Sequence, residues 1–162
     1  MLNAECRMHN EQQKGDVLED KLANFEHLEV WKKACILCVD LFCVLENSKL
    51  FGLKDQILRS AVSIPSNIAE GSERGSDADY IRFLYYSKGS SAELRTQLYI
   101  AQKVGIIPDK DIQNYVKETK DISKMIQGLI NKIKRDLNAK SKKPNAECGK
   151  QNAKKAKCRD LH

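Results

Sequence analysis

Two cysteines with C-x-x-C spacing, Cys35 and Cys38, are the first residues whose types and spacing could do chemistry. Such a pair can hold a metal ion or cycle between dithiol and disulfide. A metal site needs further ligands at suitable spacing, and a redox motif lies between a strand and a helix. The sequence offers no second pair, and the histidines are His9, His27 and His162, none of them spaced for ligation. We therefore predict free cysteines that behave as small hydrophobic residues, with no metal and no cofactor.

Motifs of common enzymes are also missing from the sequence. It contains no phosphate-binding glycine loop, no H-E-x-x-H zinc motif and no nucleophile motif. Glu93 is not followed by a histidine at the spacing that di-iron helical bundles use. We predict that the protein is not an enzyme.

A row of basic and aromatic residues between positions 85 and 103 is a better candidate for function. At about 100° per residue, these side chains share the helix face opposite the expected core: Tyr85, Lys88, Arg95, Tyr99 and Lys103. Basic side chains neutralise phosphates and tyrosines stack on bases, so the pattern predicts a nucleic-acid-binding surface. Two alternatives are a solvated face with half-exposed tyrosines and an interface between subunits.

The net charge of +6 is concentrated at the C-terminus. Residues 139–162 hold 8 basic and 2 acidic side chains, whereas residues 25–138 carry a net +2 and residues 1–24 a net −2. The C-terminal segment has almost no large apolar groups, so we predict a basic disordered tail. We also predict a disordered N-terminal extension over residues 1–24. The tail could contact RNA or DNA, and the lysines expected to do so are Lys154, Lys155 and Lys157.

Four helices are expected to position these residues. Apolar side chains recur every three or four residues in segments of about 27–46, 53–70, 76–104 and 108–138. Ser76 is a good N-cap for the third segment, and Gly105 is expected to end it. Short connections favour antiparallel neighbours, so the predicted fold is all-α, an antiparallel up-down-up-down four-helix bundle over residues 25–138.

The same spacing predicts which side chains form the core. In the first segment the expected stripe is Leu28, Trp31, Cys35, Cys38, Leu41 with Phe42, and Leu45. In the third it is Phe83, Ser87, Ser90, Leu94, Leu98 and Ala101, with small residues at 87, 89 and 90 that would allow another helix to approach closely. In the fourth it is Ile112, Val116, Thr119, Ile122, Ile126, Leu129, Ile133 and Leu137.

The second segment contains a run, residues 56–74, that breaks the usual rules for a helix. Pro65 lies inside the apolar pattern, where it removes a backbone donor and predicts a kink. Gly71 is expected to act as a C-cap. Asn67 and Glu70 are polar residues on a largely apolar helix, so they belong either to a structural hydrogen-bond network or to a self-association surface.

This run resembles the signature of the bacterial four-helix-bundle family named for proteins encoded in intervening sequences of large-subunit ribosomal RNA genes. Residues 25–34, Phe-Glu-His-Leu-Glu-Val-Trp-Lys-Lys-Ala, resemble its opening motif, and residues 79–98 resemble its third-helix motif. The signature residues that the resemblance connects with structure or oligomerisation are Pro65, Ser66, Asn67, Glu70 and Gly71. Related bundles are accessory proteins of diversity-generating retroelements. Resemblance to them implies a homo-oligomer, a pentamer in that branch, that binds RNA or DNA and a reverse transcriptase.

Two functions follow as hypotheses. One is a non-enzymatic nucleic-acid-binding or accessory module, and the other is a structural or protein-interaction bundle without nucleic-acid affinity. No membrane contact is expected, because the longest apolar run, 34–45, is well short of the ~20 residues that span a bilayer. The first residues lack an apolar signal-peptide core, so we expect a cytoplasmic protein.

Overall fold

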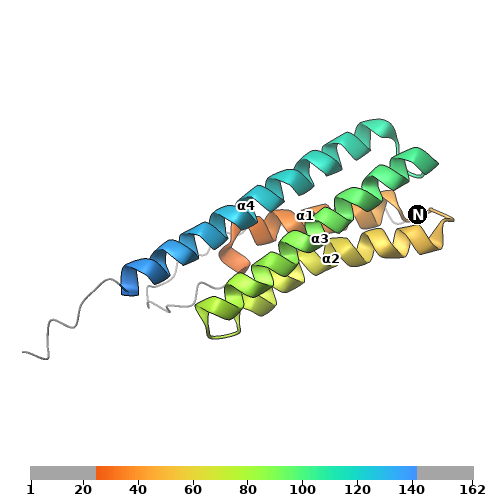
Figure 1. Cartoon of the computed structure of the whole chain (residues 1–162). Helices are drawn as coiled ribbons and strands as arrows, with labels where there is room; N and C mark the ends of the chain where they lie inside the picture. The colour runs from red at the N-terminus through yellow and green to blue at the C-terminus, as the bar shows by residue number, and fades with distance from the viewer. Residues whose placement is uncertain (1–24, 142–162) are drawn as a thin grey trace, which may run out of the picture.

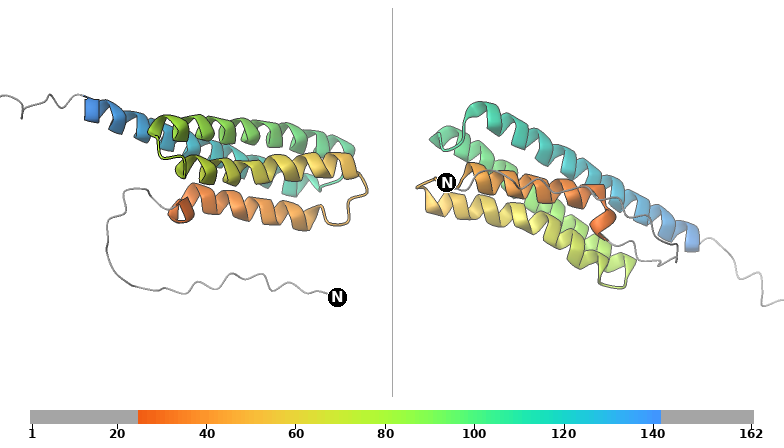
Figure 2. Two further views of the ribbon diagram at one scale, coloured as in Figure 1. Left: turned by 90° about the horizontal axis from the view of Figure 1, so that it is seen from below. Right: turned by 180° about the vertical axis from the view of Figure 1, so that it is seen from behind.

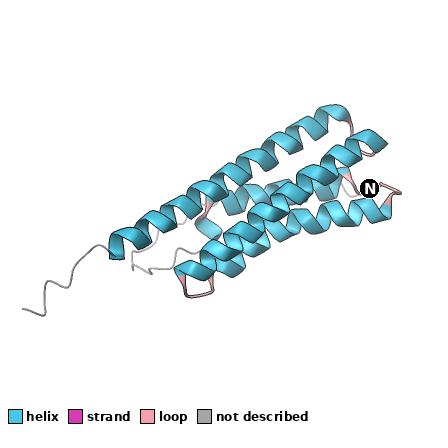
Figure 3. Cartoon of the chain, in the orientation of Figure 1, coloured by secondary structure: helices cyan, strands magenta, loops and turns pink. Residues whose placement is uncertain are grey.

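The computed structural model describes residues 25–141 of the 162-residue chain. A short 3₁₀ turn (η1, Phe25–His27) precedes four α-helices, which are α1 (Glu29–Val44), α2 (Phe51–Ser72), α3 (Asp77–Val104) and α4 (Asp109–Ser141) (Figure 1). Consecutive helices run antiparallel, and the described residues contain helices and loops but no strand (Figure 3). The predicted all-α four-helix bundle is therefore confirmed. The two predicted extensions lie outside the described residues, except that α4 continues three residues beyond position 138.

Each helix packs against the next one along the chain, and α4 also packs against α1; Figure 2 shows the bundle from two further sides. The seam between α2 and α3 is the most extensive, and that between α1 and α4 is the least. Since α4 is antiparallel to α3 and longer, its last turns lie beside the start of α3 and extend past it. Lys140 Nζ is 3.3 Å from Asp77 Oδ2, an ion pair that joins the two ends.

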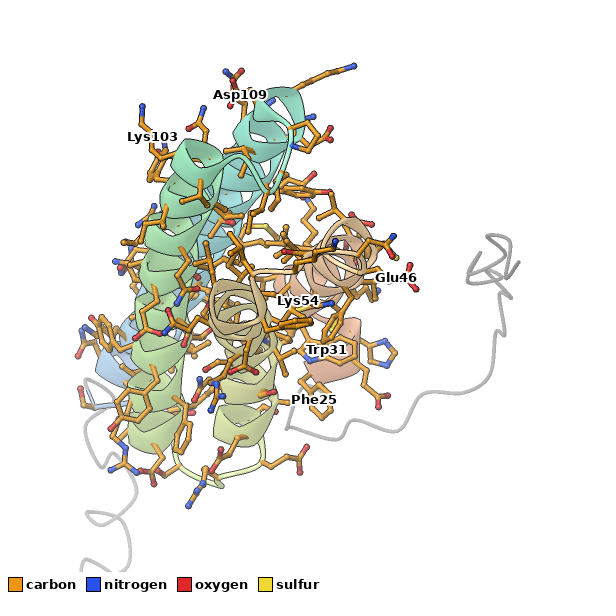
Figure 4. All side chains as sticks on the ribbon, turned by 90° about the vertical axis from the view of Figure 1, so that its right-hand side faces the viewer. Phe25, Trp31, Glu46, Lys54, Lys103 and Asp109 are labelled. Atoms are coloured by element: carbon orange, nitrogen blue, oxygen red, sulfur yellow. The ribbon has the colours of Figure 1, made fainter. Side chains whose placement is uncertain are left out.

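Local sequence signals set the helix ends as predicted. Ser76 Oγ accepts a hydrogen bond of 3.1 Å from the Asp79 backbone N–H and so caps α3. Gly105 ends that helix with φ = 72°, a left-handed conformation that glycine adopts without strain. At the same end of the bundle as Gly105, the Lys54 ammonium donates a 2.8 Å hydrogen bond to the Glu46 carbonyl just beyond α1, and Figure 4 labels both residues there.

The predicted core stripe of α1 is partly wrong. Trp31 and Cys35 are only half-buried, whereas the side chains that face the core are Val30, Ala34, Leu37, Cys38, Leu41 and Leu45. The reason is that α1 is apolar around most of its circumference, so spacing alone does not single out one face. One consequence is an exposed apolar row, in which Ile36 is 60% exposed, Val39 51% and Phe42 49%.

The core faces of α3 and α4 agree better with the prediction. All of the α3 side chains expected inside are buried, as are those of α4 from Ile112 to Ile126. Further along α4, Leu129, Ile133 and Leu137 are only half-buried, and Ile130 is the buried side chain there.

The prediction that Gly71 caps α2 is wrong. The helix continues to Ser72, and the glycine with positive φ in the following turn is Gly75. Gly71 is buried against α3: a Cβ added to it would lie 2.6 Å from the Cβ of Phe83 and 3.0 Å from Cδ2 of Tyr80. Gly71 is therefore a glycine of close helix approach, and α2 passes through Pro65 as a continuous helix.

Hydroxyl groups line the seam between α2 and α3. The interhelical hydrogen bonds are Ser60 to Gln97 at 2.6 Å, Ser63 to Ser90 at 2.9 Å, and Ser87 to the Ile64 carbonyl at 2.8 Å. The small residues Ser87 and Ser90 thus allow the close approach that was predicted. Gly89 does not take part, because it is exposed and a Cβ added there would meet nothing within 4 Å.

Candidate nucleic-acid interface

The predicted basic and aromatic row of α3 lies along the groove between α3 and α4. Lys88 Nζ donates a 2.6 Å hydrogen bond to Oε1 of Gln127 on α4. Lys134, also on α4, donates a 3.0 Å hydrogen bond to the hydroxyl of Tyr85. Both residues thus flank the neighbouring helix, while Tyr85 remains exposed, as expected for a side chain opposite the core.

Helix α4 adds a polar row to the same groove. The residues of this row are separated by four and three positions in turn, which keeps them on one side of a helix. They are Gln113, Lys117, Lys120, Lys124, Gln127, Asn131 and Lys134. None of the seven is acidic. The spacing could have revealed this row from the sequence. That the row lies beside the basic and aromatic residues of α3 is known only from the packing of α3 against α4.

At one end of the groove, the polar groups are occupied by one another. Besides its hydrogen bond, Lys134 Nζ lies 5.2 Å from the centre of the Tyr85 ring, a cation–π distance. The hydrogen bond from Lys134 and its positive charge lower the pKa of the Tyr85 hydroxyl. Gln127 in turn donates a 2.9 Å hydrogen bond to Asn131. This end is satisfied internally and has little free capacity for a ligand.

The other end carries basic side chains that form no ion pair or side-chain hydrogen bond with another described residue, although Lys117 adds a small effect to that of Lys124 in lowering the pKa of the Asp121 carboxyl. Among the described residues, no ion pair or side-chain hydrogen bond forms at Arg95, Lys103, Lys117 or Lys120. They surround Tyr99, whose side chain is 48% exposed. We call Arg95, Tyr99, Lys103, Lys117 and Lys120 the open basic face. Figure 4 shows Lys103 at the end of α3, near the start of α4 where Asp109 lies.

A hollow opens in the surface at Tyr99. It has a volume of about 300 Å³ and is lined by Tyr99, Gln102, Ile112, Gln113, Val116, Lys117 and Lys120. A second hollow of about 400 Å³ adjoins it across Tyr99 and Gln102 and reaches Lys103 and Val104. The open basic face is thus concave at its centre.

Charge is divided unequally between the two halves of the bundle. Residues 77–141 contain 12 basic and 8 acidic side chains, whereas residues 25–76 contain 6 basic and 7 acidic ones. The small positive charge of the bundle therefore belongs to α3 and α4.

The signature run divides into an inner and an outer part. Pro65 and Gly71 are buried, and Asn67 Nδ2 donates hydrogen bonds of 2.7 Å to the Ser63 carbonyl and 3.0 Å to its hydroxyl. Glu70 is exposed and forms an ion pair with Arg74. The exposed Ser66 donates to the Val62 carbonyl at 2.8 Å. Asn67 is thus linked through the Ser63 hydroxyl to Ser90 of α3, whereas Pro65 and Gly71 are buried without a side-chain hydrogen bond of their own.

Cys35 and Cys38 of α1 are poorly suited to thiolate chemistry. Burial, with a smaller contribution from Cys35, raises the pKa of Cys38 to about 12, and burial also raises the pKa of Cys35. The thiolate is the form that binds metals and attacks disulfides, so both thiols are largely inactive near neutral pH. No group of three or more metal-ligating side chains occurs within residues 25–141.

The predicted tail lysines, Lys154, Lys155 and Lys157, lie outside the described residues. Within the described part of the chain, no helix is both long enough and apolar enough to cross a bilayer.

Comparison with known proteins identifies the family but not an activity. No curated protein matches the chain. A crystal structure of a protein with unknown function from the S23 ribosomal protein family of Bacteroides thetaiotaomicron VPI-5482 is similar, with a TM-score of 0.59 and 25% identity. The match covers 62% of this chain and 97% of that one. The family model of the 23S rRNA-intervening sequence proteins matches residues 26–128, so the chain belongs to that family, as its sequence motifs predict.

Proposed function

We propose that the protein is a non-enzymatic nucleic-acid-binding module and that its open basic face binds single-stranded RNA. The observation that carries this proposal is the set of cations around Tyr99 that make no ion pair with any described residue. RNA is the first ligand to test, because an exposed tyrosine among cations suits unpaired bases and phosphates.

Electrostatics supports this assignment. Surface cations that are already paired gain little from a phosphate, because the existing pair must be given up. Arg95, Lys103 and Lys120 can neutralise phosphates at no such cost, and Lys117 gives up only a weak attraction to Asp121. Each contact releases a condensed counterion. The exposed ring of Tyr99 supplies a stacking surface, which is available to the unpaired bases of a single strand but not to those inside a duplex.

The direct test is fluorescence anisotropy with a labelled single-stranded RNA over a series of salt concentrations. We expect the logarithm of the association constant to fall linearly with the logarithm of salt concentration, with a slope of about −0.7 per phosphate neutralised. The double variant Lys103→Glu, Lys120→Glu should bind at least ~10-fold more weakly and show a shallower slope.

A matched control is the double variant Lys49→Glu, Lys132→Glu. It changes the net charge by the same amount at exposed lysines outside the open basic face. If both double variants lose the same affinity, or if wild-type binding does not depend on salt, the proposal is wrong. Circular dichroism of each variant verifies that the helices remain formed.

A second candidate function, a protein-interaction bundle, is favoured by one specific observation. The apolar row of Ile36, Val39 and Phe42 on α1 is exposed in the single chain, and exposed apolar patches commonly mark interfaces. This row would suit the homo-oligomer that the sequence resemblance implies. A pentameric state and a reverse-transcriptase partner are further proposals on the same basis.

A further inference from the structure

The hollow at Tyr99 has walls of three chemical kinds. Its floor includes Ile112 and Val116, which are 1% and 6% exposed. Its polar wall carries the amide groups of Gln102 and Gln113, and the Tyr99 ring forms an aromatic wall. No acidic side chain lines it.

These walls match the chemistry of a nucleobase. A base is a planar aromatic ring with hydrogen-bond donors and acceptors on its edges, so it can stack on a tyrosine while an amide reads its edge. Each glutamine amide offers both a donor and an acceptor, and neither amide group is hydrogen-bonded to another described residue. The volume of about 300 Å³ lies at the lower end of the ~300–1,000 Å³ typical of ligand pockets, which suits a single ring system.

Lysine side chains lie on two sides of the hollow. Lys117 and Lys120 approach it from α4, and Lys103 lines the adjoining hollow on α3, with Tyr99 between the two spaces. A strand whose base enters the hollow would carry its phosphates out on both sides, toward these lysines.

A comparison with Tyr85 shows why Tyr99 is the better candidate for stacking on a base. Both tyrosines belong to the predicted row and are exposed to a similar degree, 43% and 48%. The ring and hydroxyl of Tyr85 are engaged by Lys134, whereas Tyr99 has no ring contact with another described side chain. Only Tyr99 of the two offers a free ring beside a hollow.

We propose that the hollow between α3 and α4 holds one unstacked base of a single-stranded RNA against Tyr99, with the flanking phosphates bound by Lys103 on one side and by Lys117 and Lys120 on the other. This proposal rests on the nucleic-acid-binding function proposed above. It adds a base-binding site to what would otherwise be a sequence-independent electrostatic surface.

The test compares an oligonucleotide RNA with the same RNA made entirely of abasic nucleotides, which keeps the phosphates and removes the bases. Base–aromatic stacking is worth ~1–3 kcal/mol per base. The wild-type protein should therefore bind the intact RNA roughly 5- to 150-fold more tightly than the abasic RNA at equal salt. Tyr99→Leu should lose most of this preference without changing the salt slope, and Tyr99→Phe should keep it.

Tyr85→Leu is the matched control and should retain the preference for intact RNA. If the wild-type protein binds both RNAs equally with a normal salt slope, or if Tyr85→Leu and Tyr99→Leu behave alike, the base-binding site is wrong while the electrostatic interface stands. If the wild-type protein binds neither RNA, both proposals are wrong.

Discussion

Gly71 determines how closely α2 and α3 approach each other. Its missing side chain leaves room for Phe83 and Tyr80, and Arg74 from the next turn lies over the Phe83 ring with its Cζ 4.9 Å from the ring centre. Glycine is required both at helix caps and where two helices approach closely. From the sequence alone, a glycine near the expected end of a helix is therefore taken for a cap. Only the position of α3 distinguishes the two roles, and this is why the sequence-based prediction for Gly71 was wrong.

Two separate glycine-to-alanine variants, one at Gly71 and one at Gly89, test this role. Gly71→Ala forces the two helices apart or strains the added Cβ, so we expect a loss of ~1–3 kcal/mol in the free energy of unfolding. Gly89→Ala is its matched control, since Gly89 lies within α3 in open space, and there alanine should add about 0.4–1 kcal/mol by restricting the unfolded chain. Urea unfolding followed by circular dichroism measures both values. A neutral or stabilising Gly71→Ala would contradict the close-approach role.

At the scale of elements, prediction succeeded where polar residues separate the apolar ones. Helix α3 has polar side chains between its core positions, so its buried face could be read from spacing alone. In α1, by contrast, exposed Ile36 and Val39 are as apolar as buried Leu37 and Leu41, and spacing could not choose between them. The α4 part of the candidate interface was missed for a different reason, because it becomes a site only beside α3.

The apolar row of α1 predicts self-association through that helix. Phe42→Glu places a charge in the row, and we expect it to shift the protein from an oligomer to a monomer without loss of helix content. Phe51→Glu makes the same substitution at a residue that is 74% exposed at the start of α2, outside the row, and should leave the oligomer intact. Light scattering coupled to size-exclusion chromatography measures the mass. A wild-type monomer, or equal masses for the two variants, would argue against α1 as the interface.

For the molecule as a whole, the buried thiol of Cys38 and the partly buried phenol of Tyr80 make the folding stability depend on alkaline pH. Burial is the main cause that raises the pKa of Cys38 from 9.0 to about 12, and burial raises that of Tyr80 from 10.0 to about 12. Between the unfolded and folded pKa values, the native state keeps protons that the unfolded chain has released, so the free energy of unfolding falls as pH rises. The stabilising contribution is complete below pH 9.0 for Cys38 and below pH 10.0 for Tyr80, and both are lost by about pH 12.

This linkage can be measured by urea unfolding across that pH window. The fall in stability should begin near pH 9.0 in the wild type, become shallower in Cys38→Ala, and become shallower above pH 10.0 in Tyr80→Phe. Each variant is compared with its own stability at neutral pH, so the packing lost by the substitution does not affect the slope. Identical slopes in all three proteins would show that neither group is linked to folding.

The length of α4 and its ion pair with Asp77 bear on the number of points at which the chain can bind one RNA strand. Lys120 lies at the open basic face, and Ser141 lies at the opposite end of the bundle, about 30 Å away at 1.5 Å per residue. The basic segment 142–162 follows Ser141 directly. Under the proposed function the chain can therefore bind one RNA strand at two points, the open basic face and the basic segment that follows α4. A strand that contacts both points gains avidity through the effective concentration at the second point, whereas a strand that contacts only one point gains none.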